Sequence, residues 1–341
     1  EELFNGWKDK KFGESKGLDA LVGNRQLDVI IGGPPCQAYS VAGRIRDEHG
    51  MREDYRNYLF ESYLKVVQHY KPRVFVFENV PGILSAKPGD GSVRIIDLIQ
   101  KAFADAGYAV LPDLSNAIID MTEYGVPQNR KRIIILGVSK EHYGDKAEAM
   151  VEKFYSSYLP EYKIEKKATV RDAIGDLPKL RPLDEPISYL GRKLSHSVSD
   201  PLINGHISRF HNKRDIELFK FLEEDIASGR MKYTSAKSLK TLYTKLTGKT
   251  SNVHKYYVLR WDEPSNLIPA HLFKDGLRHI HPDPEQARTI TVREAARLQT
   301  FPDNYYFNCS QTDAFKMIGN AVPPLFAKKV AYAIYHLIQE N

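Results

Sequence analysis

Strand patterns and helix patterns alternate along the first part of the chain, and this alternation limits the fold more than any other feature. Short β-branched and aromatic runs indicate buried strands, whereas apolar residues spaced by three and four indicate helices. The expected elements are strands at 29–31, 74–77, 108–119 and 132–138 and helices at 59–70 and 95–106. Such alternation produces a parallel sheet covered by helices. We therefore predict an α/β fold with a doubly wound, mostly parallel sheet.

The pattern changes after about residue 180, where prolines become frequent and a single helix is expected, near 215–226. We predict a catalytic domain at 1–185 and a smaller, irregular domain at 186–283. The segment 284–341 is expected to return to the first domain and to contain a helix at 292–298. Its last helix begins at Pro323-Pro324 and is predicted to pack on that domain.

Charge is distributed unevenly over the 341 residues, which carry a net charge of +6. Between Glu185 and Arg260 there are 14 basic and 7 acidic residues, whereas the rest of the chain has 35 basic and 36 acidic residues. All of the positive excess therefore lies in the smaller domain. Such segregation favours a polyanionic partner, most simply the phosphates of a nucleic acid.

Composition excludes several classes of protein. Apolar residues make up 42% of the chain and charged residues 27%, as in ordinary globular proteins. No apolar run approaches the roughly 20 residues that span a bilayer, so no membrane partner is expected. The two cysteines, Cys36 and Cys309, form no disulfide framework, which favours a reducing compartment.

Cys36 follows the first predicted strand in the run Gly32-Gly33-Pro34-Pro35-Cys36-Gln37. Gly-Gly-Pro-Pro ends the strand sharply and places the thiol at the carboxyl edge of the sheet, where α/β proteins bind ligands. A cysteine on its own is more often a buried structural thiol. The rigid prolines before it and the polar residues after it favour an exposed nucleophile.

Ionisable side chains flank two other predicted strands. Glu78 follows the apolar run 74–77, where partial burial would favour the protonated form of a general acid, although an ordinary strand-end carboxylate is an equal alternative. Arg130 and Arg132 lie just before the apolar run 133–136 and would share one face of an extended segment. Two guanidiniums there could hold an anion or a polarised carbonyl, although basic residues beside strands are common.

Five motifs occur in the order typical of one enzyme family. They are Pro35-Cys36-Gln37, Glu78-Asn79-Val80, Gln128-Asn129-Arg130-Lys131-Arg132, Thr291-Val292-Arg293-Glu294-Ala295-Ala296-Arg297-Leu298-Gln299 with Phe301-Pro302-Asp303, and Gly319-Asn320-Ala321-Val322-Pro323-Pro324. The chain therefore resembles the C5-cytosine DNA methyltransferases of bacterial and phage restriction-modification systems. The resemblance implies the S-adenosylmethionine-dependent methyltransferase fold with a smaller target-recognition domain.

The resemblance also implies the chemistry. Cys36 would add to C6 of a cytosine flipped out of duplex DNA, and C5 would then accept the methyl group of S-adenosylmethionine. Glu78 would bind N3 of the base and Arg132 its O2, with Arg130 supporting the site. No metal is required, and the loop 40–56 would close over the base.

Binding residues follow from the same resemblance together with the charge pattern. The expected cofactor contacts are Pro35, Leu59, Asn320 and Val322. The expected DNA contacts are Gln37, Ser40, Arg44, Arg46, Arg209, Lys213, Arg214, Lys237, Lys240 and Lys245, with Lys249 as a further phosphate contact.

The sequence departs from the family pattern before Cys36. A Phe-x-Gly-x-Gly loop and an acidic residue for the cofactor ribose are expected there but are not found. An upstream segment or a second polypeptide could supply them; otherwise a monomer is predicted. The predicted location is the cytoplasm, in association with the nucleoid. Two alternative functions stay open: methylation of cytosine in tRNA, and DNA binding by a catalytically incomplete subunit.

Overall fold

The protein is described from a computed structural model that covers residues 1–34, 59–87 and 92–341. The described chain forms two compact units. The first unit comprises residues 1–119 and 132–155 with Asn341, and the second comprises 120–131 and 156–340. Each unit is defined by the contacts among its own residues. The functional domain boundaries expected at 185 and 283 stay a prediction.

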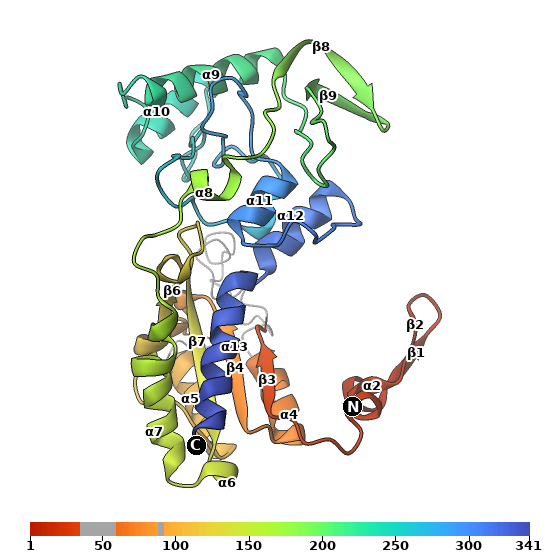
Figure 1. Cartoon of the computed structure of the whole chain (residues 1–341), viewed down its shortest axis with the longest axis vertical. Coiled ribbons are helices and arrows are strands. Elements are labelled where there is room, and N and C mark those ends of the chain that lie inside the picture. Colours follow the sequence, from red (N-terminus) through yellow and green to blue (C-terminus); the bar gives the residue numbers. More distant parts are fainter. Residues whose placement is uncertain (35–58, 88–91) are drawn as a thin grey trace. The chain divides into compact units, whose positions relative to one another are not determined.

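A mixed sheet forms the centre of the first unit (Figure 1). Its strands, in spatial order, are β3 (Val29–Gly32), β4 (Val74–Asn79), β7 (Lys131–Ser139) and β5 (Tyr108–Ala109), and β6 (Ile118–Asp120) also pairs with β7. β3 and β4 are parallel, whereas β7 is antiparallel to β4 and β5. The α/β class is thus confirmed, with a sheet of mixed direction.

The direction of β7 has a local cause. Strands that run parallel need a crossover connection between them, whereas antiparallel strands do not. The expected helices α4 (Leu59–Tyr70) and α5 (Ile95–Asp105) can provide such crossovers. Between β5 and β7 the chain forms only short elements, namely β6 and the 3₁₀ turns η3 (Leu114–Ala117) and η4 (Met121–Tyr124). The single strand expected at 108–119 was therefore wrong, since turn residues divide it.

Aromatic side chains join the helices to the sheet. Phe75 and Phe77 of β4 are fully buried, and the Phe75 ring lies 4.4 Å from that of Phe103 in α5. The Tyr63 hydroxyl on α4 donates to the Val76 carbonyl at 3.0 Å. Tyr63 and Phe103 both contact Phe75 and Phe77, so the two helices pack on one face of β4, which carries Glu78 near its end.

Shorter elements complete the first unit. They are α1 (Glu2–Asn5), β1 (Trp7–Asp9), β2 (Gly13–Ser15), α2 (Gly17–Val22), η2 (Pro81–Leu84), α6 (Lys140–Tyr143), α7 (Lys146–Lys153) and the start of η5 (Phe154–Tyr158). The hydroxyl of Tyr155 donates to the Ile134 carbonyl at 2.6 Å, which ties this last segment to β7.

The second unit is mainly helical and has two apolar clusters. Its elements are η6 (Pro160–Tyr162), α8 (Val170–Ile174), β8 (Pro182–Tyr189), β9 (Arg192–His196), α9 (Lys213–Ala227), α10 (Ala236–Thr247), η7 (Ala270–Phe273), α11 (Val292–Leu298), α12 (Gln311–Asn320) and α13 (Pro324–Gln339). One cluster joins α8, α11, α12 and η7, and the other joins α9 to α10. The helices expected near 215–226, at 292–298 and after Pro323 are confirmed, whereas α10 and α12 were missed.

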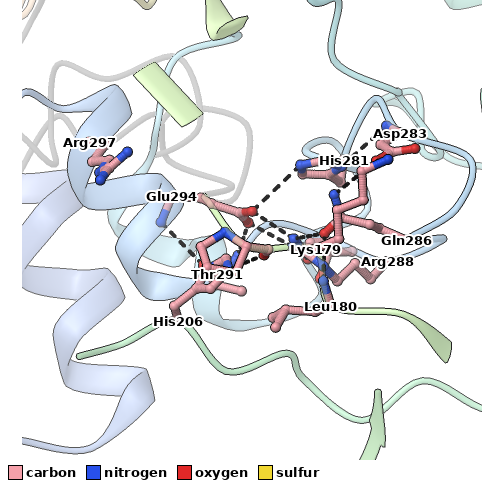
Figure 2. A network of polar contacts seen from close by, with 12 residues as sticks. Lys179, Leu180, His206, His281, Asp283, Gln286, Arg288, Thr291, Glu294 and Arg297 are labelled. Carbon is pink, nitrogen blue, oxygen red and sulfur yellow. Dashed lines mark hydrogen bonds and ion pairs between the residues drawn. The ribbon is translucent and has the colours of Figure 1, made fainter. Parts of the chain in front are cut away.

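A buried polar network holds α11 in place (Figure 2). Arg288 donates through both terminal nitrogens to Glu294, each bond being 2.7 Å long. Glu294 also accepts from the Thr291 amide at 2.7 Å, and the Thr291 hydroxyl caps the helix in return. Burial alone would raise the pKa of Glu294, but Arg288 outweighs burial and holds that pKa well below its ordinary value.

Candidate active site

The carboxyl ends of β3 and β4 bring two of the sequence motifs together. The strands pair in parallel with Gly32 opposite Phe77, so the residues that follow each strand emerge at the same edge. The Asn79 amide donates to the Pro34 carbonyl at 3.4 Å. A Cβ atom on Gly33 would lie 2.8 Å from a Glu78 carboxylate oxygen, so a larger residue at position 33 would displace the Glu78 side chain.

Glu78 forms an ion pair with Arg132 at this edge. The Nε atom of Arg132 lies 3.0 Å from a carboxylate oxygen of Glu78, and the side chains are only 12% and 20% exposed. The register of β4 and β7 explains the contact, because Glu78 pairs with Ile134 and Arg132 lies two residues before Ile134 on the same face, as a diagonal neighbour of Glu78. The Arg132 guanidinium thus places a positive charge beside the partly buried carboxyl group of Glu78.

Arg130 has a different environment from the one expected. Its side chain is 2% exposed, and one terminal nitrogen donates to the carbonyl of Ala321 at 2.9 Å and to that of Gly319 at 3.4 Å. The expectation of a shared face assumed that both arginines belong to one strand, but β7 begins at Lys131. Within the second unit, Arg130 therefore supports the Gly-Asn-Ala-Val turn.

The predicted cofactor contacts occupy the ends of helices. Leu59 is half-buried at the first residue of α4. Asn320 is exposed at the last residue of α12, and Val322 is half-buried just before α13. Among the described residues, the Asn320 side chain has no hydrogen-bond partner. An amide left exposed in this way is available to a polar ligand.

Six predicted site residues lie outside the described residues, as does the whole loop 40–56. They are Pro35, Cys36, Gln37, Ser40, Arg44 and Arg46, of which Cys36 is the nucleophile candidate. The described chain approaches Cys36 as far as Pro34. The only cysteine within the described residues is Cys309, which is exposed.

Most of the predicted DNA contacts in the second unit are exposed lysines and arginines. Lys213 pairs with Glu185 at 3.3 Å and Arg214 with Asp215 at 3.2 Å. Three others, Lys237, Lys240 and Lys245, lie on the exposed face of α10, opposite buried Leu239 and Leu242. No ion pair between described residues involves any of these three lysines.

Arg209 does not match its predicted role of phosphate contact. Its guanidinium donates to the carbonyls of Leu272 at 2.7 Å and Phe273 at 3.1 Å, and it lies 4.4 Å from the centre of the Phe315 ring. Burial lowers the pKa of Arg209 to about 10. We correct this assignment: the positive excess of the region suggested a surface cation, but this guanidinium is used inside the unit.

The charge count missed a second signal in the same region. From Arg230 to Trp261 the chain contains eight basic residues and no aspartate or glutamate. α10 lies within this run, and its spacing of Lys237, Lys240 and Lys245 places all three on one helix face. Periodicity combined with the absence of acids could have located this surface from the amino-acid sequence alone.

An open cleft of about 420 Å³ also occurs in the second unit. Arg297 lies in its wall and pairs with Asp176 at 2.5 Å and Asp303 at 2.7 Å, so its charge is neutralised by contacts within the unit. Within residues 1–34, 59–87 and 92–341, no cluster of three potential metal ligands occurs. No helix in these ranges is both long enough and apolar enough to cross a membrane.

Comparison with known proteins decides the family. Residues 5–336 match the model of the C-5 cytosine-specific DNA methylases. The chain belongs to this family. Type II methyltransferase M.Bpa9945I of Bacillus paralicheniformis is 38% identical, over 92% of this chain and 71% of that protein. Type II methyltransferase M.AgeI of Thalassovita gelatinovora is 32% identical, over 93% of this chain and 84% of that protein.

Solved structures agree with this assignment. A putative DNA modification methyltransferase encoded within an Escherichia coli prophage has 25% sequence identity and a TM-score of 0.56, and the match covers 94% of this chain and 82% of that one. The predicted family and enzyme class are thereby confirmed. This methylase is a C5-cytosine DNA methyltransferase of the restriction-modification type.

Proposed function

We propose that this methylase transfers a methyl group from S-adenosylmethionine to C5 of a flipped cytosine in duplex DNA, through a covalent bond between Cys36 and C6. The observation that carries the proposal is the Glu78–Arg132 ion pair, with an N–O distance of 3.0 Å, at the same sheet edge as Gly33-Pro34. In the sequence, Cys36 follows Pro34 by two residues.

The proposed roles follow from the demands of the reaction. The thiolate of Cys36 adds to C6, and the electron pair of the C5–C6 bond becomes available at C5. Glu78, when protonated, donates a hydrogen bond to N3 and Arg132 donates to O2, the two positions where negative charge develops during the addition. Because each of these two side chains fixes the other, both are oriented before the base arrives. C5 would then accept the methyl group as the methyl–sulfur bond breaks and S-adenosylhomocysteine leaves. A base removes the C5 proton, and the C6–S bond breaks to release Cys36.

The cofactor supplies an electrophilic methyl group attached to a positively charged sulfur. The residues proposed to hold it are Pro35, Leu59, Asn320 and Val322. Within the second unit, the exposed amide of Asn320 and the half-buried side chain of Val322 offer one polar and one apolar contact to such a ligand.

DNA binding is proposed for the lysine face of α10. Lys237, Lys240 and Lys245 are exposed and lie within the acid-free run 230–261, so their charges are available to phosphates. Lys213, Arg214 and Lys249 are proposed as further contacts, as are Gln37, Ser40, Arg44 and Arg46 near the base. Residues 186–283 would then form the target-recognition domain of a monomeric, cytoplasmic enzyme.

A direct experiment tests the reaction. Mixed-sequence DNA is incubated with the protein and S-adenosylmethionine and then analysed by bisulfite sequencing, with Cys36→Ala as the control. We expect methylated cytosines in one sequence context with the wild type and none with the variant. Normal methylation by Cys36→Ala would refute the nucleophile assignment, and methylation of tRNA without methylation of DNA would refute the substrate.

The covalent step has its own test. An oligonucleotide containing the recognised site with 5-fluorocytosine at the target lacks the C5 proton whose loss precedes release of the enzyme. With S-adenosylmethionine we therefore expect a protein–DNA complex that survives denaturing electrophoresis. Its appearance with Cys36→Ala, or its absence with an active wild-type enzyme, would contradict the proposed adduct.

A further inference from the structure

Two buried glutamines that the reaction leaves without a role meet inside the second unit. Gln128 and Gln299 are both fully buried. The Gln128 amide nitrogen donates to the side-chain oxygen of Gln299 and to the Leu298 carbonyl, the latter at 3.0 Å. Its amide oxygen accepts from the backbone amide of Ile268 at 3.1 Å. Both ends of the Gln128 side chain are therefore held, and its orientation is fixed.

The contact with Gln128 also fixes the orientation of Gln299. Because the Gln299 oxygen accepts from Gln128, its amide nitrogen must point the other way. That nitrogen donates to the Ala321 carbonyl at 2.6 Å. The same carbonyl accepts from Arg130 at 2.9 Å. A directed chain of hydrogen bonds thus runs from Gln128 through Gln299 to Ala321, and buried chains of this kind are sensitive to any missing member.

Ala321 lies in the turn that presents the proposed cofactor contacts, with Asn320 before it and Val322 after it. α12 ends at Asn320, and Ala321 adopts an extended conformation. On the other side, the helix end is pressed against η7: a Cβ atom on Gly319 would lie 2.2 Å from the Ala270 nitrogen. The turn is therefore fixed both by packing at Gly319 and by two donors on one carbonyl.

We propose that Gln128 and Gln299 are positioning residues that hold the turn 320–322 in the conformation that binds the cofactor. This inference rests on the proposed function, in which Asn320 and Val322 contact S-adenosylmethionine. Neither glutamine touches the cofactor. They act through the Ala321 carbonyl, so their effect falls on cofactor affinity, not on the addition of Cys36 or on DNA binding.

The decisive variant is Gln299→Glu, which keeps the shape of the side chain but places a second oxygen opposite the Ala321 carbonyl. Gln299→Met and Gln128→Met remove the hydrogen bonds without adding charge. Binding of S-adenosylhomocysteine to the full protein is measured by titration calorimetry. We expect Kd to rise about tenfold or more in Gln299→Glu, since loss of one buried hydrogen bond of this strength corresponds to about a factor of ten.

Steady-state kinetics separate positioning from general damage. We expect KM for S-adenosylmethionine to rise in all three variants while KM for DNA stays unchanged. Combining Gln128→Met with Gln299→Met should cost less than the sum of the single effects, because both act through one hydrogen-bond chain.

Gln286→Met is the matched control. Gln286 is also buried, and it bonds to Arg288 at 2.6 Å and to the Leu180 amide at 3.0 Å, away from the turn. We expect this variant to lose stability and keep the wild-type Kd. An equal rise of Kd in Gln286→Met, or an unchanged Kd in both Gln299 variants, would overturn the inference. Failure of the wild type to bind S-adenosylhomocysteine would instead overturn the proposed cofactor site, and this inference with it.

Discussion

Arg288 and Glu294 form a two-bonded ion pair in which neither side chain is more than 1% exposed (Figure 2). The pair joins the segment before α11 to the first turn of that helix. Glu294 also completes the helix cap with Thr291. One carboxylate therefore neutralises the buried Arg288 charge and also caps α11, and its removal would affect both the ion pair and the helix end.

Glu294→Gln should destabilise the protein strongly, because it leaves the Arg288 charge buried without its partner. We expect a loss of about 3–5 kcal/mol in the free energy of unfolding, measured by urea denaturation. Glu285→Gln is the control, since the exposed pair of Glu285 with Arg181 is surrounded by water and should contribute little to stability. Equal losses in the two variants would contradict the importance of burial.

Glu223 should make stability depend on pH. Burial raises the pKa of Glu223 well above 4.5, nearby Arg288 opposes this rise, and Asp283 and Glu224 add to it. Because the folded-state pKa is raised, the contribution of Glu223 to stability is fully present below the unfolded-state pKa. It is lost as pH rises through the folded-state pKa.

We therefore expect Glu223→Gln to gain stability relative to the wild type as pH rises from about 5 to about 8. Denaturation at several pH values measures the difference. Glu217→Gln, an exposed position on the same helix, serves as the control and should follow the wild-type curve. A constant difference between Glu223→Gln and the wild type across this range would refute the assignment.

Replacing Lys237, Lys240 and Lys245 together by glutamine should weaken DNA binding and reduce its dependence on salt. Each phosphate interaction that the variant removes should lower the slope of log K against log salt concentration by about 0.9. Fluorescence anisotropy at several salt concentrations measures this slope. The control replaces Lys101, Lys140 and Lys163, whose charges are paired with acidic residues at 2.6 Å. Equal slopes in the two triple variants would place the DNA elsewhere.

Glu78→Gln and Arg132→Gln should each lower kcat/KM for methylation by about 10²–10³, because each removes a group that stabilises charge on the base. The double variant should be little worse than either single one, since the two side chains hold each other. Lys131→Gln, which alters an exposed neighbour, should retain activity. Additive effects of Glu78 and Arg132 would mean that the ion pair has no role in orienting them.

Local patterns predicted the parts of the fold that depend on local information. The continuous apolar run 74–77 predicted a strand, observed as Val74–Asn79, and the helical spacing of apolar residues predicted the helix Leu59–Tyr70; both are confirmed. α10 was missed because its polar face carries lysines and threonines, whose scattered appearance concealed the spacing of Leu239 and Leu242. The antiparallel direction of β7 depends on which strands it joins, and no short segment contains that information.

In the candidate site, too, local features could be predicted whereas long-range contacts could not. The resemblance assigned Glu78 and Arg132 to the same base, and the structure shows these two side chains in contact where one strand ends and the next begins. The partners of Arg130 and Gln299 could not be predicted, because they lie close to 190 and 170 positions away along the chain, at Ala321 and Gln128. Arg209 was misassigned for a related reason: composition reports how many cations a segment has, but not which of them are buried.

The lysine face of α10 has a consequence for how the enzyme would reach its target. Three uncompensated charges on one helix attract any stretch of duplex, whatever its sequence, and such attraction speeds encounter. A protein held by phosphates alone can move along DNA without dissociating. The search for a recognition site would then proceed largely along the duplex. Added salt would slow this search at concentrations too low to affect methyl transfer itself.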